Sequence, residues 1–315
     1  MSEPTISGAP RTGPARSAGE SAVVATSGGG RDVRLDDGRV LRVHDSGEVG
    51  GGVGGHGTGG DTGRTLIWHH GSPQSGALLA PLLGASRQRG VRLVSYGRPS
   101  YGGSTPDPGR TVAAAADDVA RLAHALGLDR FAVMGASGGG PHALACGALL
   151  PGRVTAAVSV SGLAPWTGDE DWFAGMRSDG GLRAAVGGRE GRARFAETDV
   201  FDEECFTAPD RAALAGPWAS LGADAGSAGE AWPDGLIDDD VAFVAPWGFD
   251  PADIAVPVLL VQGGEDRVVP PAHADRLLRL CPRSELWLRP RDGHISVLEA
   301  CAVAMDWAFA QAGPR

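Results

Sequence analysis

A pentapeptide of small residues around one serine, Gly-Ala-Ser-Gly-Gly at 135–139, constrains the fold of this chain more than any other feature. The apolar run before it predicts a strand over Phe131–Met134, and the alanine-rich sequence after it predicts a helix running to about Leu150. Small residues allow the strained backbone of a sharp strand-to-helix turn, which lifts the Ser137 hydroxyl clear of its neighbours. The same turn aims the backbone N–H of Gly138 at an oxyanion formed beside that hydroxyl.

Apolar runs of strand length recur along the chain, with helical stretches between them. The other expected strands are Asp32–Leu35, Arg39–His44, Thr65–His69, Val91–Ser95, Val154–Val160, Val256–Val261 and Glu285–Leu288. The first two are joined by an Asp-Gly pair, which supplies the positive φ of a tight hairpin turn. Residues 111–126 carry apolar side chains at helical spacing. Strands that alternate with helices predict an α/β fold with a mostly parallel sheet covered on both faces.

Length and charge narrow the class of protein. A chain of 315 residues suits one large α/β domain with an insertion. Its net charge is −10, all its basic side chains other than histidine are arginines, and no basic stripe runs along it. This balance argues against nucleic acids and anionic membrane surfaces as partners. No metal site is expected, because no Cys/His cluster has ligand spacing, and we expect no cofactor.

The cysteines and the N-terminus favour a cytoplasmic protein. The four cysteines lie far apart, and we expect them to be reduced and mostly buried: they are Cys146, Cys205, Cys281 and Cys301. No apolar run approaches the roughly 18–20 residues of a spanning helix. The N-terminus shows no basic region followed by an apolar one, so no signal peptide is expected.

Composition divides the chain into segments. Residues 1–30 are rich in Gly, Ser, Pro and Ala, and we expect them to be disordered. A flexible glycine-rich loop is expected at 47–63, where a formal match to the dinucleotide fingerprint carries no weight because no helix follows it. The α/β core is expected over 31–162 and 249–315, with a helical insertion over 163–248 between its halves.

The insertion has two unusual properties. It holds 17 acidic residues against 6 arginines, and 10 of the 16 Trp and Phe residues of the chain. The aromatic residues can form the insertion's own core, or they can line an apolar pocket beneath a lid. Both interpretations stay open here. The candidates for a pocket lining are Trp166, Trp172, Phe173 and Trp247.

A serine nucleophile needs a base, and the base needs an orienting carboxylate. In this topology the acid and then the histidine should follow the serine. Asp266 comes after the strand that ends in two glycines, and His294 lies in a loop after the last strand. The 28 residues between them fit one strand–helix–strand excursion, so the two loops can lie side by side. Glu265 can replace Asp266 as the acid, and Asp292 is a more distant alternative.

The first turn after Thr65–His69 reads His-Gly-Ser-Pro. A glycine there lets the backbone approach the nucleophile, so the N–H of Ser72 can join that of Gly138 in an oxyanion hole. We expect His70 to brace this loop by hydrogen bonds, at the edge of the substrate pocket. The other histidines are interpreted as structural: they are His69, His124, His142 and His273.

These motifs together resemble the α/β-hydrolase superfamily, and most closely its lidded esterase, lipase and proline-iminopeptidase-like members. The motifs are His70–Pro73, Tyr96–Ser104, Gly135–Gly139, Asp266 and Gly293-His294. The resemblance implies an eight-stranded sheet with an antiparallel second strand and a helical lid after the sixth. It also implies Ser137 as nucleophile, His294 as base, Asp266 as acid, and the amides of Ser72 and Gly138 as the oxyanion hole. The second motif departs from the Asp-Arg-Pro-Gly that is usual there, because Gly97 and Ser100 replace the Asp and the Gly.

The sequence therefore predicts a cofactor-free serine hydrolase that cleaves an ester or related acyl bond of a small to medium apolar substrate. A serine at the elbow, in place of an aspartate, indicates acyl transfer rather than epoxide or haloalkane chemistry. One alternative is a proline-iminopeptidase-like aminopeptidase, in which carboxylates of the acidic insertion bind a substrate ammonium. The candidates are the acidic runs Asp202-Glu203-Glu204 and Asp238-Asp239-Asp240. Another is a non-hydrolytic ligand-binding protein of the same fold. The partner is a small ester or peptide-like molecule, and the sequence does not indicate the oligomeric state.

Overall fold

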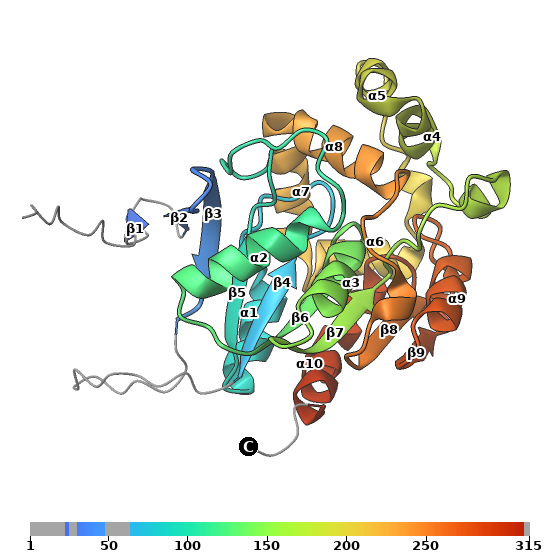
Figure 1. Ribbon diagram of the computed structural model, residues 1–315. Helices are drawn as coiled ribbons and strands as arrows, with labels where there is room; N and C mark the ends of the chain where they lie inside the picture. Colours follow the sequence, from blue (N-terminus) through green and yellow to red (C-terminus); the bar gives the residue numbers. More distant parts are fainter. Residues whose placement is uncertain (1–22, 25–29, 48–63, 312–315) are drawn as a thin grey trace, which may run out of the picture.

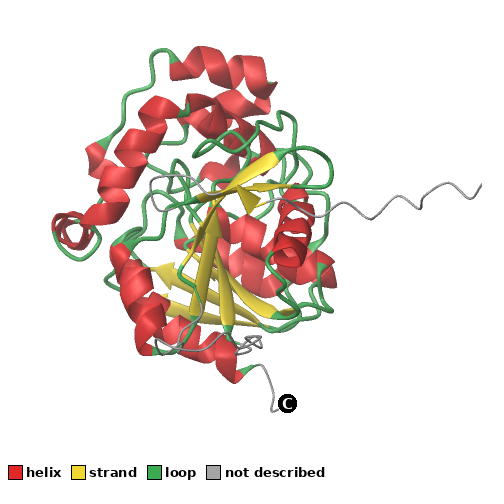
Figure 2. Cartoon of the chain, turned by 90° about the vertical axis from the view of Figure 1, so that its left-hand side faces the viewer, coloured by secondary structure: helices red, strands yellow, loops and turns green. Residues whose placement is uncertain are grey.

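The computed structural model describes residues 23–24, 30–47 and 64–311. The expected disordered segment 1–30 and glycine-rich loop 47–63 lie almost entirely outside these residues. The described chain forms one sheet with helices on both of its faces and a helical layer beyond one of its edges (Figure 1, Figure 2).

Nine strands of the described residues form one sheet, in the spatial order β1-β2-β3-β5-β4-β6-β7-β8-β9. The strands are β1 (Val23–Val24), β2 (Arg31–Arg34), β3 (Val40–Asp45), β4 (Thr65–His69), β5 (Arg92–Tyr96), β6 (Phe131–Ala136), β7 (Val154–Val160), β8 (Val258–Gly263) and β9 (Ser284–Arg289). β3 pairs antiparallel with β2 and β5, and every neighbouring pair from β5 to β9 is parallel. Strands β2 to β9 are thus the eight expected strands with an antiparallel second one. The two-residue β1 is an addition that pairs antiparallel with β2.

The central strands are mostly apolar and are buried along their whole length because both faces of the sheet are covered. All residues of β4, β6 and β8 are buried. Successive side chains of β4 enter different cores: Ile67 packs on one face, and Leu66 and Trp68 pack on the other.

Five helices supply the other half of these two cores. They are α1 (Ala80–Gln88), α2 (Ala114–Ala125), α3 (Gly139–Leu149), α9 (Pro271–Leu280) and α10 (Cys301–Ala310). α2, α3 and α9 pack on the face of Ile67, while α1 and α10 pack on the opposite face. The helix expected over 111–126 begins at Ala114, and its predicted apolar face is buried at Val119 and Leu122. No helix in the described ranges combines the length and apolar character needed to cross a bilayer.

The segment between β7 and β8 is helical. Its elements are η1 (Glu170–Phe173), α4 (Gly180–Val186), α5 (Gly188–Ala196), η2 (Glu203–Cys205), α6 (Ala208–Ala215), α7 (Ala219–Ala231) and α8 (Pro233–Phe243), and η3 (Pro251–Asp253) leads back to the sheet. These helices lie beyond one edge of the sheet, with α4 and α5 outermost (Figure 1). We call this segment the insertion.

Candidate active site

Ser137 occupies the turn between a strand and a helix that the sequence predicted. β6 ends at Ala136, α3 begins at Gly139, and Ser137 has the positive φ of +52° that marks a strained elbow. Glycine is required on both sides, because a Cβ on Gly135 would collide with the carbonyl of Gly139, and one on Gly139 would collide with that of His69. The side chain of Ser137 is held at the carboxyl edge of the sheet and remains partly exposed.

Asp266 and His294 form a buried pair on the neighbouring loops. Asp266 Oδ1 accepts hydrogen bonds from the backbone N–H groups of Val268 and Val269, both at 2.9 Å. Asp266 Oδ2 faces His294 Nδ1 at 2.8 Å. The two loops are also joined by their backbones, because the N–H of Glu265 donates to the carbonyl of Asp292 at 2.9 Å. The two alternative acids make other contacts. Asp292 forms an ion pair with Arg289, and Glu265 contributes a backbone hydrogen bond between the two loops.

The environment of His294 sets both its tautomer and its basicity. Its Nδ1–H donates to Asp266, which leaves the lone pair of Nε2 for another proton. Burial lowers the pKa of His294, but the charge and hydrogen bond of Asp266 outweigh burial and hold that pKa above its ordinary value. The ring is therefore a stronger base than a free imidazole.

Ser137 and this pair lie on one edge of the sheet. The N–H of Ser137 donates to the carbonyl of Val160 at 2.8 Å, and the N–H of Ser161 donates to that of Val261 at 2.8 Å. The carboxyl ends of β6, β7 and β8 are thereby aligned, which is where functional groups gather in parallel sheets. The Ser137 hydroxyl makes no hydrogen bond to His294 or to any other group in the described part of the chain. Such bonds commonly tighten only when substrate binds.

The loop after β4 is braced against the loop after β5 by His70. Its Nδ1–H donates to the carbonyl of Gly71 at 2.6 Å, and its Nε2 accepts from the N–H of Arg98 at 3.1 Å. Burial, followed by the charge of Arg98, holds the pKa of His70 well below its ordinary value, so the ring is neutral. Both nitrogens are occupied by backbone groups, which fits a bracing role.

The predicted oxyanion hole consists of the backbone N–H groups of Ser72 and Gly138. Within the described residues, neither the N–H of Ser72 nor that of Gly138 donates to another group of the chain. The two residues are in close contact, because a Cβ on Gly138 would collide with Ser72 Oγ. Gly71 lies on the other side, where a Cβ would approach the Cβ of Ser137 to 3.7 Å. Both free donors therefore lie next to the elbow.

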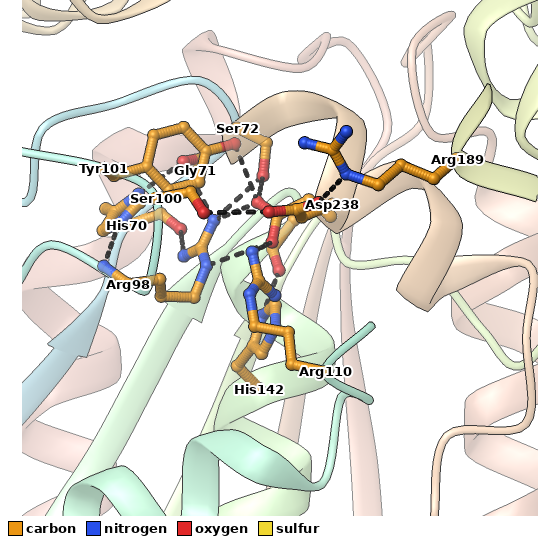
Figure 3. Close-up of polar contacts among 12 residues, drawn as sticks. His70, Gly71, Ser72, Arg98, Ser100, Tyr101, Arg110, His142, Arg189 and Asp238 are labelled. Carbon is orange, nitrogen blue, oxygen red and sulfur yellow. Dashed lines mark hydrogen bonds and ion pairs between the residues drawn. The ribbon is translucent and has the colours of Figure 1, made fainter. Parts of the chain in front are cut away.

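A buried cluster of charges fixes the Ser72 loop to the insertion (Figure 3). Asp239 of α8 is fully buried and accepts from Arg98 Nη2 and Arg110 Nη2, both at 2.6 Å. It also accepts from the hydroxyl of Ser72 and, at 3.0 Å, from that of Tyr101. The two arginines hold the pKa of Asp239 well below its ordinary value against the opposing effect of burial. In the sequence, Asp239 is one member of the acidic run 238–240 that was considered for binding a substrate ammonium, and no local pattern distinguishes it from its neighbours in that run.

The other carboxylates of this acidic run are also occupied. Asp238 accepts from Arg189 Nε at 2.9 Å and from the hydroxyl of Ser100 at 2.8 Å. Asp240 accepts from Arg192 Nε at 2.6 Å. Both are buried within the protein rather than displayed to solvent. In the other acidic run, Asp202 accepts from Arg177 Nε at 2.8 Å.

The aromatic side chain at the elbow is Phe243, which the sequence did not select for the pocket. A Cβ on Gly138 would approach Phe243 Cζ to 3.1 Å, and the Phe243 ring meets the His142 ring edge-on at 5.8 Å between centroids. Phe243 is the last residue of α8, so the end of this helix covers the elbow. The place of Phe243 in an aromatic-rich segment indicated that it would be buried. Nothing in the sequence indicated that it would pack against the elbow.

The predicted pocket aromatics pack into the main apolar core of the protein. Trp172, Phe173 and Trp247 are buried in the apolar cluster on the α3 face of the sheet. The indole N–H of Trp172 donates to a backbone carbonyl at 3.0 Å, and that of Trp247 does so at 3.2 Å. Trp166 is partly buried against the same cluster. No hydrogen bond or ring contact in the described residues joins these four to Ser137, so their place in the pocket stays a prediction.

The described residues contain no group of three or more His, Cys, Asp or Glu side chains able to hold a metal ion. All four cysteines are buried, and none forms a disulfide. The carboxyl ends of the strands bring together a hydroxyl, an imidazole hydrogen-bonded to a carboxylate, and two backbone N–H groups.

Comparison with known proteins agrees with this architecture. The family of the alpha/beta hydrolase fold matches residues 64–300, and the chain belongs to that family. It is a hydrolase of the α/β-hydrolase class.

The individual relatives described next share less than a third of their residues with this chain. A protein of Caulobacter sp. (strain K31), named as a presumed carbamate hydrolase, RutD, is 28% identical over 254 residues, covering 73% of this chain and 84% of its own. A malate-bound thermophilic esterase from Thermogutta terrifontis has a TM-score of 0.62 at 20% identity, covering 90% of this chain and 98% of its own. The enol-lactonase from Burkholderia xenovorans LB400 has a TM-score of 0.65 at 19% identity, and the match covers 89% of this chain and 99% of the enol-lactonase. These two structures show the shared fold.

Proposed function

We propose that this chain is a serine hydrolase that cleaves an ester or related acyl bond of a small to medium apolar substrate through an acyl-enzyme. The observation that carries the proposal is the buried pair of Asp266 and His294, 2.8 Å apart, on the sheet edge where Ser137 occupies its elbow. Three relatives described above are named for hydrolysis of a carbamate, an ester and a lactone, each of which contains an acyl carbon bonded to oxygen.

The first half-reaction transfers the acyl group to the enzyme. Ser137 Oγ attacks the acyl carbon while its proton passes to Nε2 of His294, and the carbonyl π electrons move onto oxygen. The N–H groups of Ser72 and Gly138 stabilise that oxyanion. When the tetrahedral intermediate collapses, the bond to the leaving alcohol breaks and His294 returns its proton to the alcohol oxygen. The product of this step is an ester of Ser137.

The second half-reaction uses water in place of the alcohol. His294 takes a proton from water as the oxygen attacks the acyl carbon, and the same oxyanion hole stabilises the charge. Collapse of the intermediate breaks the bond to Ser137 Oγ, which recovers its proton from His294. Asp266 keeps the imidazole in one tautomer and stabilises the imidazolium in both halves.

The aminopeptidase alternative is disfavoured by the state of the acidic insertion. A substrate ammonium needs a free carboxylate, but Asp238, Asp239 and Asp240 are buried and each of them pairs with an arginine. The acidic run of α8 therefore serves the fold, and the apolar Phe243 at the elbow favours an uncharged acyl group.

Turnover of matched substrates tests the proposal. We expect the purified protein to hydrolyse aryl acetate and butyrate esters, with weaker activity on aryl carbamates and little on amino-acid arylamides. Faster cleavage of a free N-terminal proline arylamide would establish the aminopeptidase instead. Absence of turnover on the whole panel, together with saturable ligand binding, would establish a non-hydrolytic binding protein.

A further inference from the structure

Asp210, in the first turn of α6, is a fully buried carboxylate surrounded by hydrogen-bond donors. From its own helix end, the N–H and hydroxyl of Thr207 both donate to Oδ2 at 2.9 Å. From the catalytic loop, the N–H of His294 donates to Oδ2 at 3.2 Å. The N–H groups of Ile295 and Ser296 donate to Oδ1 at 2.9 and 2.8 Å, and the Ser296 hydroxyl does so at 2.8 Å.

Helix capping alone does not explain this arrangement. The capping box of α6 needs only the contacts between Asp210 and Thr207, and these occupy Oδ2. Oδ1 accepts only from the loop that follows His294, more than 80 residues further along the chain. The carboxylate therefore joins the insertion to the loop that carries the candidate base. The sequence signal, Thr-x-x-Asp at 207–210, predicts the cap but not this second set of partners.

The glycine before the histidine makes the close approach possible. A Cβ on Gly293 would collide with Asp210 Oδ2 and would lie 2.7 Å from Thr207 Oγ1. The N–H of Gly293 donates at 2.8 Å to the Ser296 hydroxyl, which in turn donates to Asp210. Four consecutive residues of the loop, 293–296, are thus arranged around one carboxylate.

Asp210 affects His294 through its negative charge as well as through its hydrogen bonds. Burial raises the pKa of Asp210, but the donated hydrogen bonds outweigh burial and hold the pKa below its ordinary value. The retained negative charge also raises the pKa of His294, in addition to the larger effect of Asp266. Geometry and electrostatics therefore both connect Asp210 to the base.

We propose that Asp210 is a positioning residue for His294: it fixes the backbone of the catalytic loop from the insertion, so that the ring can bridge Asp266 and Ser137. This proposal rests on the proposed function, because it takes His294 as the general base. It also means that α6 must stay docked on the core during turnover, since its departure would release the loop.

The first test is Asp210→Asn. This variant replaces one acceptor oxygen by an NH₂ group that meets N–H donors, which loosens the loop without changing its volume. We expect kcat on an aryl ester to fall between about 10-fold and 100-fold. KM should change little, and the acid limb of the kcat/KM pH profile should move to lower pH because a negative charge near His294 is lost. Wild-type kcat and an unmoved acid limb would overturn the proposal.

Thr207→Val is the matched control for helix stability. It removes the hydroxyl that caps α6, but it leaves the hydrogen bonds from the loop after His294 to the carboxylate of Asp210 in place. We expect a lower melting temperature with an unmoved acid limb. If this variant reproduces both the kcat loss and the shifted limb of Asp210→Asn, the role of Asp210 is structural only.

Ser296→Ala keeps the proposal falsifiable if Asp210→Asn does not fold. It removes one donor to Asp210 and the acceptor of the Gly293 N–H. A fall in kcat in the same direction supports the proposal, and an unchanged kcat overturns it. Failure of the proposed function is separable, because His294→Ala would then retain ester hydrolysis.

Discussion

Among single residues, the buried histidines differ by what their ring nitrogens contact. His294 faces a carboxylate, and its pKa is raised. His70, His142 and His273 instead bond to backbone groups, and burial holds their pKa values below the ordinary range. Among these four histidines, the environment of His294 is the one that stabilises an imidazolium, as the proposed general base requires.

We expect Asp266→Asn to lower kcat by roughly 10³-fold to 10⁴-fold, because an amide neither fixes the tautomer nor stabilises the imidazolium. His294 must be neutral to act, so activity is lost as pH falls through its raised pKa. The acid limb of wild-type kcat/KM should therefore lie above 6.5, the ordinary pKa of histidine, and should move down in the variant. The pH profile of ester hydrolysis measures both effects.

Asp292→Asn is the control for this prediction, since Asp292 is a neighbouring carboxylate that pairs with Arg289 instead. It should retain near-wild-type kcat. A large loss in Asp292→Asn together with an active Asp266→Asn would move the acid to position 292.

The sequence reveals the role of a residue when that role depends on its immediate neighbours in the chain. Ser137 and His294 stand in short motifs with small neighbours. At Gly135 the backbone itself excludes a side chain, whereas at Gly293 the side chains of Asp210 and Thr207 do so. Asp210 and Asp239 are different, because their partners come from distant parts of the chain. No local pattern states which carboxylate of an acidic segment turns inward. The sequence therefore did not select Asp210, and it offered Asp239 to a substrate ammonium rather than to the protein's own arginines.

Among the helices, α8 shows how an acidic run can stabilise a fold. Three consecutive residues on a helix point about 100° apart, so Asp238, Asp239 and Asp240 must meet three different surroundings. Each of them pairs with a different arginine or pair of arginines, and all three are buried. From the sequence alone, these carboxylates were candidate ligands of a substrate ammonium. In the structure they pair instead with arginines of the protein itself.

We expect Asp239→Asn to lower the free energy of unfolding by about 3–5 kcal/mol, because it leaves Arg98 and Arg110 buried beside a neutral amide. Urea unfolding measures this change. Asp234→Asn on the same helix is the control, since its pair with Arg189 is largely exposed and should contribute less than about 1 kcal/mol. Equal effects of the two substitutions would contradict the importance of the buried cluster.

The elements themselves were more predictable than their contacts. Strand β7 was predicted with its observed bounds, and β5 begins one residue later than predicted. These strands consist mostly of apolar and small residues, so their burial follows largely from composition. The docking of α8 on the elbow depends on the contact of Phe243 with Gly138, which no periodicity encodes.

For the molecule as a whole, folding brings together loops that lie far apart in sequence. The loops after β4, β6, β8 and β9 meet at one edge of the sheet, and the insertion contacts them through Asp239, Phe243 and Asp210. The same compactness excludes water from several histidines, and this exclusion makes stability depend on pH.

We expect stability to fall in mild acid in part because His273 resists protonation in the fold. Burial lowers its pKa to about 4, whereas the unfolded chain binds that proton near pH 6.5. Between these values the unfolded state binds more protons, so the free energy of unfolding decreases as pH decreases. One such histidine contributes a slope of at most about 1.4 kcal/mol per pH unit.

Comparison with His273→Gln isolates this contribution, because Asp240 and His294 titrate in the opposite sense. The amide keeps a donor and an acceptor but does not titrate. Urea unfolding at several pH values should give a shallower slope for the variant between about pH 6 and pH 4.5. Identical slopes would show that His273 does not carry this effect.

The most direct measurement of the central claim is covalent labelling with a fluorophosphonate, followed by peptide mass spectrometry. A serine activated by His294 should displace fluoride and leave one phosphonyl group on Ser137 of the native protein. Ser137→Ala should remain unlabelled, and His294→Ala should label far more slowly. Labelling of Ser137→Ala to the wild-type extent, or of another serine in the native protein, would contradict the account.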